Sequence, residues 1–188
     1  MKPILSIAVH PSGYYMAAGF VDKVRVMHIL DDELRDFRIL DHKNVSKMKF
    51  SNGGQFLVIV EQRMFYIYSS YTLELLTKNK SASTTISSIS FNTNDTGMAM
   101  TAEGFVSRYD LVNFKFKGEG TIDRNCDFRS SLFIPDAKDE FKIMTVGAES
   151  SHAFCRVYNQ NEDVELTFKD VEEKSHMKSY SEACHVKS

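Results

Sequence analysis

The feature that most constrains the fold of this chain is a short pattern that recurs every 41 residues. In each copy an apolar strand end is followed by a polar turn, as in Val9–Gly13. The residues that end these strands are Val9, Phe50 and Phe91. A second set of apolar residues, at the start of the third strand of each copy, keeps the same spacing: Val24, Phe65 and Val106. Because two independent sets share one spacing, we interpret the pattern as an internal repeat.

Each copy contains four short segments that are apolar or alternate between apolar and polar residues, with polar turns between them. This pattern is typical of β-strands joined by hairpins. In the first copy the segments are 5–9, 14–20, 24–29 and 34–40. A fourth copy starts slightly late, because Phe133 follows Phe91 by 42 residues.

Four-stranded units at this period, with no helical pattern between them, predict an all-β fold built from β-propeller blades. We expect residues 1–168 to form about four blades, at 4–40, 45–77, 86–118 and 127–168, followed by a polar tail at 169–188. A β-sandwich is the alternative, but it would not need equal spacing. Each blade carries apolar residues on both faces, so we expect the blades to be part of a larger or composite ring.

Composition excludes several classes of function. The net charge is −2 and no dense Lys/Arg cluster is present, which argues against nucleic acid as a partner. The longest clean apolar run, Phe56–Val60, is too short to span a membrane, and the first residues are not typical of a signal peptide. Three cysteines, an odd number, do not form a disulfide framework. We therefore expect a cytoplasmic or cytoskeletal protein that binds neither nucleic acid nor membrane.

The third unit resembles a WD40 repeat. Its segment Glu103–Leu111 is similar to the usual ending of that repeat, Asp-Gly-Thr-Val-Arg-Leu-Trp-Asp-Leu. The chain has no tryptophan, and His42 lies one residue away from the usual His position. We therefore expect packing to carry more of the stability of the blades than in a family member with the buried His–Ser/Thr–Trp–Asp network. WD40 repeats usually build rings of more than four blades, so another chain or further sequence would complete the ring.

Several strings resemble one group of WD40 proteins more closely, the ciliary family of cilia- and flagella-associated protein 57. They are His10–Gly13, Gly19–Met27, Asp31–Arg35, Phe50–Gly54 and Pro135–Lys138. The resemblance implies a non-catalytic scaffold of the motile cilium axoneme, part of the cytoskeleton, whose partners are other proteins such as inner dynein arm or regulatory-complex components. The alternative is a cytosolic WD40 adaptor in trafficking or ubiquitin ligation.

No residue pattern completes a catalytic, cofactor or metal site. His152 and Cys155 have ligand spacing, but no second pair supplies four ligands, and Cys184–His185 lies in the tail. Gly118–Gly120 is interpreted as a turn between blades, because it lacks a third glycine and opens no helix. We therefore expect no enzyme activity, no metal and no cofactor.

Three other groups have simpler interpretations than a binding site. The acidic residues Asp31, Asp32, Glu33 and Asp36 would protect a sheet edge, and Lys43, Lys47 and Lys49 would form a solvated surface. The aromatic residues Phe65, Tyr66 and Tyr68 follow one another along a third strand, and packing within and between blades would explain Phe65 and Tyr68 without a ligand. For a partner, we expect the exposed face of the first blade, within Leu5–Ile29, to be the binding surface.

Overall fold

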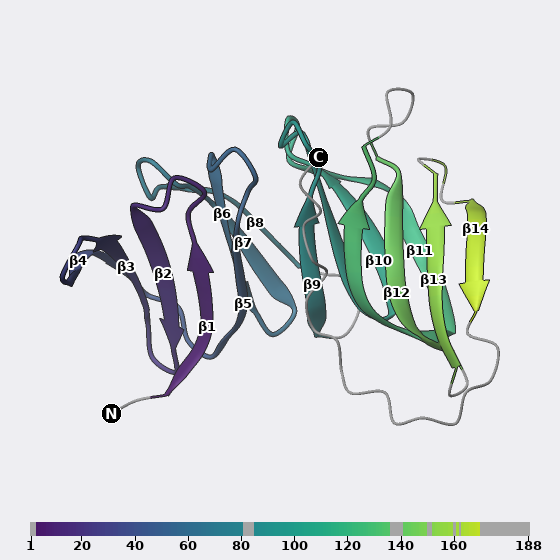
Figure 1. The fold of residues 1–188 in the computed structure, drawn as a ribbon, viewed down its shortest axis with the longest axis horizontal. Helices are drawn as coiled ribbons and strands as arrows, with labels where there is room; N and C mark the ends of the chain where they lie inside the picture. The colour runs from purple at the N-terminus through teal and green to yellow at the C-terminus, as the bar shows by residue number, and fades with distance from the viewer. Residues whose placement is uncertain are drawn as a thin grey trace. The chain divides into compact units, whose positions relative to one another are not determined.

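The computed structural model describes residues 3–80, 85–135, 141–149, 152–159, 161 and 163–169. Every regular element in these ranges is a β-strand, so the prediction of an all-β fold is confirmed (Figure 1). Among the described residues, no helix is long and apolar enough to cross a membrane. The chain divides into two compact units, Met1–Ile86 with Thr93–Asp95, and Ser87–Asn92 with Thr96–Ser188.

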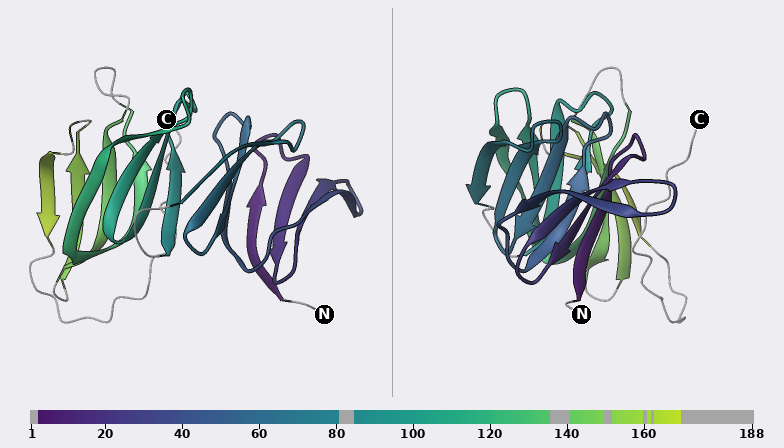
Figure 2. Two further views of the ribbon diagram at one scale, coloured as in Figure 1. Left: turned by 180° about the vertical axis from the view of Figure 1, so that it is seen from behind. Right: turned by 90° about the vertical axis from the view of Figure 1, so that its left-hand side faces the viewer.

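The first unit contains two four-stranded antiparallel sheets in which each strand pairs with the next one in the chain. The first sheet, purple to blue in Figures 1 and 2, consists of β1 (Ile4–Val9), β2 (Tyr15–Phe20), β3 (Val24–Ile29) and β4 (Leu34–Leu40). The second sheet consists of β5 (Val45–Phe50), β6 (Phe56–Glu61), β7 (Met64–Ser69) and β8 (Leu75–Lys80). This meander of four strands is the arrangement of a propeller blade.

The two sheets of the first unit pack face to face. The first sheet contributes small or β-branched side chains, Ala8, Ala17, Val24 and Val26. The second sheet contributes larger ones, Met48, Phe50, Leu57 and Ile59. Because side chains alternate between the two faces of a strand, this contact uses one face of each sheet, and the other face of the first sheet takes no part in it.

A buried, hydrogen-bonded histidine in the connection between β4 and β5 contacts the second sheet. His42 is almost fully buried, and its Nδ1 lies 2.9 Å from Glu61 Oε1 while its Nε2 lies 2.8 Å from the Tyr68 hydroxyl. A carboxylate only accepts, so Nδ1 donates to Glu61, and Nε2 and the Tyr68 hydroxyl share the second hydrogen bond. The second blade thus keeps a hydrogen-bonded histidine, and one of its partners is Tyr68, which stands at the position of the tryptophan in the WD40 ending.

A turn of the second sheet is fixed by contacts from three directions. The Asp95 carboxylate accepts hydrogen bonds from the backbone N–H groups of Asn52, at 2.9 Å, and Gly53, at 2.7 Å. The Gly54 carbonyl faces His10 Nε2 at 2.9 Å and accepts a hydrogen bond from the Ser70 hydroxyl. Gly54 has a φ of +79°, and a Cβ there would lie 2.4 Å from His10 Nε2, so only glycine fits.

The second unit contains one six-stranded antiparallel sheet, with the strands in the order β14-β13-β12-β11-β10-β9. The strands, teal to yellow in Figure 2, are β9 (Ile86–Phe91), β10 (Gly97–Asp110), β11 (Lys115–Phe133), β12 (Ile143–Glu149), β13 (His152–Tyr158) and β14 (Val164–Lys169). The long strand β11 runs through the boundary that the sequence placed between the third and fourth blades. The division of this sheet into those two blades stays a prediction.

The expected turn at Gly118–Gly120 is wrong, because these residues lie inside β11. The pairing passes from Arg108↔Lys117 to Val106↔Thr121, so the three residues form a bulge opposite one residue of β10. Gly118 and Gly120 have φ values of 77° and 83°, a conformation that glycine adopts at little cost. The two glycines therefore bend a continuous strand.

The core of the second unit is lined by the apolar residues Ala99, Val106, Cys126, Phe128, Phe133, Phe141, Ile143, Phe154 and Tyr158. Arg108 is also buried, although the WD40 ending compared above has leucine at this place. Its Nε donates to the Phe141 carbonyl at 3.0 Å, and its Nη2 donates to the Asn159 carbonyl at 2.6 Å. The side chain thus links β10 to two loops that lie far apart in the sequence.

Candidate docking face and buried charged cluster

The face of the first sheet that is turned away from the second sheet is apolar; Ala18 and Met27 on its central strands are buried, and its apolar side chains on β1 and β4 are exposed. Cross-strand pairing forms two rows of side chains across it, Ile7–Ala18–Arg25–Ile39 and Val9–Met16–Met27–Asp36. We call this surface the first face. Ile7, Val9 and Ile39 are 54%, 56% and 55% exposed. An exposed apolar row of this kind marks a surface that another protein can cover.

One ion pair joins the two rows of the first face. Arg25 Nε donates to Asp36 Oδ1 at 2.8 Å, and Arg25 Nη2 donates to Asp36 Oδ2 at 2.6 Å. The hydrogen bond from Arg25 lowers the pKa of Asp36. Because this pair already satisfies both charges, a partner that covers the face meets no unpaired charge there.

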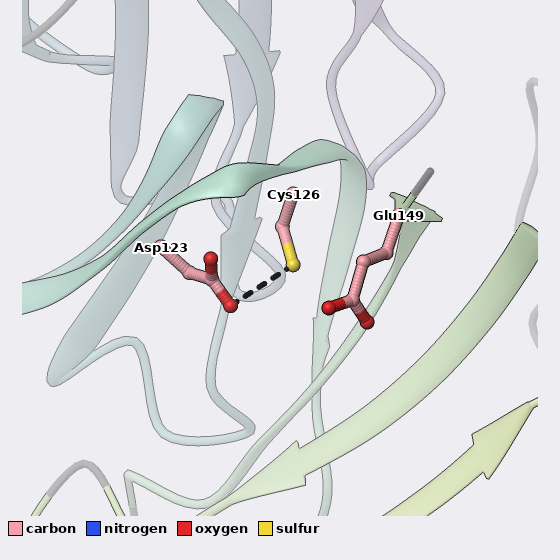
Figure 3. Close-up of side chains that lie close together, drawn as sticks. All are labelled: Asp123, Cys126 and Glu149. Atoms are coloured by element: carbon pink, nitrogen blue, oxygen red, sulfur yellow. Dashed lines mark hydrogen bonds between the residues drawn. The ribbon is translucent and has the colours of Figure 1, made fainter. Parts of the chain in front are cut away.

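A second group of side chains, which carry possible metal-ligand atoms, lies within the second unit at a bulge of β11. Asp123 and Cys126 come from β11, and Glu149 comes from the end of β12 (Figure 3). Their carboxylate oxygens and sulfur lie within 4.8 Å of one another, which is close enough for metal ligands. Among the residues that the structure describes, this is the group with that property.

Arg156 of β13 contacts all three members of this group. Its Nη1 lies 3.1 Å from Asp123 Oδ2 and 3.0 Å from Cys126 Sγ, and its Nη2 lies 2.6 Å from Glu149 Oε2. We call these four residues the charged cluster. The guanidinium group takes the position that a cation bound by the same three atoms would occupy. The geometry therefore fits an internal ion-pair cluster better than a metal site.

The protonation states in the charged cluster support this interpretation. Burial and the hydrogen bond to Asp123 raise the pKa of Cys126 to about 11, so the thiol stays protonated at neutral pH. The hydrogen bond that this thiol donates lowers the pKa of Asp123. A protonated thiol is neither a nucleophile nor a metal ligand. The cluster instead holds the bend of β11 against the hairpin of β12 and β13.

The sequence indicated different residues. His152 and Cys155 are three residues apart in β13, so their side chains point to opposite faces of the strand, and they pair with Glu149 and Val146 of β12. Cys184–His185 lies outside the described residues. No sequence pattern marked the charged cluster, because its four residues come from three strands. For the two members that share strand β11, the spacing of Asp123 and Cys126 was a signal that sequence analysis could have used.

The remaining candidates have local roles. Asp36 pairs with Arg25, and Glu33 pairs with Arg35 at 2.5 Å, so these acids do not converge on one point; Asp31 and Asp32 are exposed. Burial lowers the pKa of Lys49, whereas Lys43 and Lys47 are exposed. Phe65 and Tyr68 pack as expected, since Phe65 is fully buried and Tyr68 packs against the core of the first unit, and Tyr66 packs there too.

Comparison with known proteins gives relatives of one kind. No family model matches the chain. Mouse (Mus musculus) cilia- and flagella-associated protein 57 is 30% identical over 139 residues, which cover 73% of this chain and 11% of the relative. Cilia- and flagella-associated protein 57 A of Tetrahymena thermophila is 38% identical over 69 residues, covering 37% of this chain and 5% of the relative. The chain therefore corresponds to a small part of these relatives.

Solved structures agree on the fold. The crystal structure of the RRP9 WD40 repeats superposes with a TM-score of 0.72 at 13% identity, covering 89% of this chain and 51% of that one. The structure of U3-55K also superposes with a TM-score of 0.72 at 13% identity, covering 89% of this chain and 52% of that one. The chain thus has the fold of WD40-type β-propeller blades and is homologous, over most of its sequence, to a part of cilia- and flagella-associated protein 57.

Proposed function

We propose that this protein is a non-catalytic scaffold of the axoneme of motile cilia. The observation that carries the proposal is the identity of 30% to the mouse ciliary protein over 73% of the chain. In this role the blades would dock other axonemal proteins, such as components of the inner dynein arm or of a regulatory complex. The relatives' names place those proteins in cilia and flagella, and the identity of the partners is our inference.

The chemistry of the charged cluster supports a role without catalysis. Its carboxylates are held by Arg156 and its thiol is protonated, so the group offers neither a free general base nor a nucleophile. A binding role instead uses exposed surface. The first face supplies such a surface, with apolar residues around one satisfied ion pair.

The proposed partners include a chain that completes the propeller. This chain covers about half of each solved WD40 chain that it resembles, at 51% and 52%. The first face would be covered in a complete ring, because a blade is apolar on both sides.

The experiment that tests the proposal is localisation in a ciliated cell. A copy with a small tag is expressed, and axonemes are separated from membrane and soluble fractions. We expect the tagged chain to remain with the axoneme after detergent extraction, and cross-linking followed by mass spectrometry to recover dynein-arm or regulatory-complex proteins. A tagged chain found only in the soluble fraction, bound to coat or ubiquitin-ligase subunits, would identify the adaptor alternative and refute the axonemal role.

A further inference from the structure

The repeat reveals what kind of surface the first face is. Its residues Ile7, Val9, Met16, Ala18, Arg25 and Met27 correspond, 41 positions later, to Met48, Phe50, Leu57, Ile59, Tyr66 and Tyr68. Of these later residues, Met48, Phe50, Leu57 and Ile59 lie in the core between the two sheets of the first unit, and the partly buried Tyr66 and Tyr68 pack against it. There they lie against Ala8, Ala17, Val24 and Val26 of the preceding blade. The first face is therefore the side of a blade that packs against a preceding blade.

The second unit also carries a largely apolar, partly exposed face, which we call the second face. It consists of two cross-strand rows on β11 to β14, Leu132–Met144–Val157–Leu166 and Ser130–Val146–Cys155–Phe168. Val146, Leu166 and Phe168 are 44%, 54% and 62% exposed. The other side of these strands faces the core of the second unit, through Phe133, Ile143, Phe154 and Tyr158.

The repeat also identifies which side of a blade the second face is. Phe133 precedes its turn as Val9 does in the first blade, so Leu132 corresponds to Ala8. Pairing then makes Met144 the counterpart of Ala17, because Ala8 pairs with Ala17 and Leu132 pairs with Met144. In the first blade, Ala8 and Ala17 receive the following blade. The second face is therefore the side of a blade that receives a following blade.

The sizes of the side chains on the two faces compensate each other. Inside the first unit, large residues such as Met48 and Phe50 pack on Ala8 and Ala17. On the first face the counterparts of the large residues are the smaller Ile7 and Val9, and on the second face the counterparts of the alanines are the larger Leu132 and Met144. A contact between the two exposed faces would thus keep nearly the same total volume, which is the condition that packed interfaces tolerate best.

We propose that the first face of one copy of this chain packs against the second face of a second copy, head to tail. This inference rests on the proposed function in one respect, since it identifies the chain that completes the propeller as another copy of the same chain. The contact is heterologous, so it forms a closed ring if the rotation between copies allows closure and an open row of copies if it does not.

The test uses the full chain and two variants that each disable one face. Ile7→Glu places a charge on the first face, and Phe168→Glu places one on the second face. Both side chains are more than half exposed, so each variant is expected to fold. Val112→Glu is the matched control, because Val112 is 66% exposed and lies on neither face. Circular dichroism and thermal unfolding check that all three variants fold like the unchanged chain.

Light scattering after gel filtration then measures mass. We expect the unchanged chain and Val112→Glu to form species of at least twice 21.5 kDa that dissociate on dilution, and each face variant alone to run at 21.5 kDa. An equimolar mixture of Ile7→Glu and Phe168→Glu should form a 1:1 dimer, because one intact first face and one intact second face remain. If the contact instead joined two identical faces, mixing the two variants would not restore the association of the variant whose face is disabled.

Three results would overturn the proposal: an unchanged chain that is monomeric at all concentrations, assemblies that both face variants leave intact, or a mixture that stays monomeric. None of them bears on the axonemal localisation, which is measured separately in cells. If the unchanged chain is monomeric and associates only when another WD40 protein is added, the second copy is the wrong occupant while the proposed function stands.

Discussion

Arg156 holds the charged cluster together, and its removal should be costly. Arg156→Met leaves two carboxylates facing each other with part of their surface out of water, at Asp123 and Glu149. Breaking a buried charge pair is strongly destabilising, and because both carboxylates keep some contact with water we expect a loss of about 2 kcal/mol in the free energy of unfolding. Urea unfolding measures it, with the exposed pair of Arg129 and Asp127 as the control. Arg129→Met should change the free energy by well under about 1 kcal/mol, and equal losses would contradict the assignment.

The same cluster predicts a dependence of stability on pH. The pKa of Asp123 is lowered in the folded state, so its carboxylate stabilises the fold fully above its unfolded pKa of about 3.9. This contribution is lost as the pH falls below that value toward the folded pKa. The difference in unfolding free energy between the unchanged chain and Asp123→Asn should therefore be largest near neutral pH and shrink toward pH 2.5. A difference that is constant over this range would show that the charge of Asp123 does not contribute.

Cys126 should not react with alkylating reagents in the folded protein. Its side chain is 1% exposed, and its pKa is raised to about 11, so almost no thiolate is present at neutral pH. Treatment with iodoacetamide at pH 7.5, followed by mass spectrometry of the peptides, should label Cys126 only after denaturant is added. Labelling of Cys126 in the folded chain at the rate of a free thiol would contradict both its burial and the closed geometry of the cluster.

At the scale of single elements, His42 should contribute to the second sheet through its two hydrogen bonds. His42→Ala leaves the Tyr68 hydroxyl and the Glu61 carboxylate without their shared partner, for an expected loss of about 2 kcal/mol. Tyr68→Phe removes one hydrogen bond and should cost about 1 kcal/mol. The double variant should lose less than the sum of the two, because both changes break the same contact. Additive losses would show that the two side chains are not coupled.

The bulge of β11 should depend on glycine. A Cβ at Gly120 would lie 2.7 Å from the Phe105 ring and 3.0 Å from the Val106 carbonyl, whereas a Cβ at Gly13 meets nothing within 4 Å. Both glycines have positive φ, at 83° and 77°. Gly13→Ala should therefore cost only the backbone strain of about 1 kcal/mol, and Gly120→Ala clearly more. Thermal unfolding of both variants measures the difference, and equal shifts would mean that the bulge relaxes around the new side chain.

An element could be predicted from the sequence when the signal for it is local, and not when it depends on pairing with a distant strand. The strands of the first blade match the expected segments closely, because apolar alternation and polar turns are local signals. β8 instead runs to Lys80, past the expected end at residue 77, because an exposed outer strand needs no apolar pattern. The continuity of β11 was missed because glycines mark bulges as well as turns, and only pairing with β10 distinguishes the two.

The two candidate sites also differ in whether the sequence could predict them. The first face was expected, because the repeat predicts blades and a blade has two apolar faces. The charged cluster was not, because Asp123, Glu149 and Arg156 meet only when three strands pair in register. His152 and Cys155 were considered because they are close in sequence, yet an odd spacing in a strand sends two side chains to opposite faces. Spacing along the chain predicts ligand sets on helices and turns better than on strands.

At the scale of the whole molecule, the division into two compact units predicts separate responses to substitution. Each unit has its own core, so a change in one should raise local opening there and leave the other unit largely protected. Native-state hydrogen exchange with mass spectrometry can follow the fully buried segment Leu57–Val60 of β6 and the amides of β12 in one experiment. We expect His42→Ala to speed exchange in β6 about tenfold or more while β12 changes little, since about 1.4 kcal/mol corresponds to a factor of ten. Arg156→Met should give the reverse pattern. If either substitution speeds exchange equally in both segments, the two units open as one cooperative structure, and the stability of a blade here depends on the whole chain and not only on its neighbours.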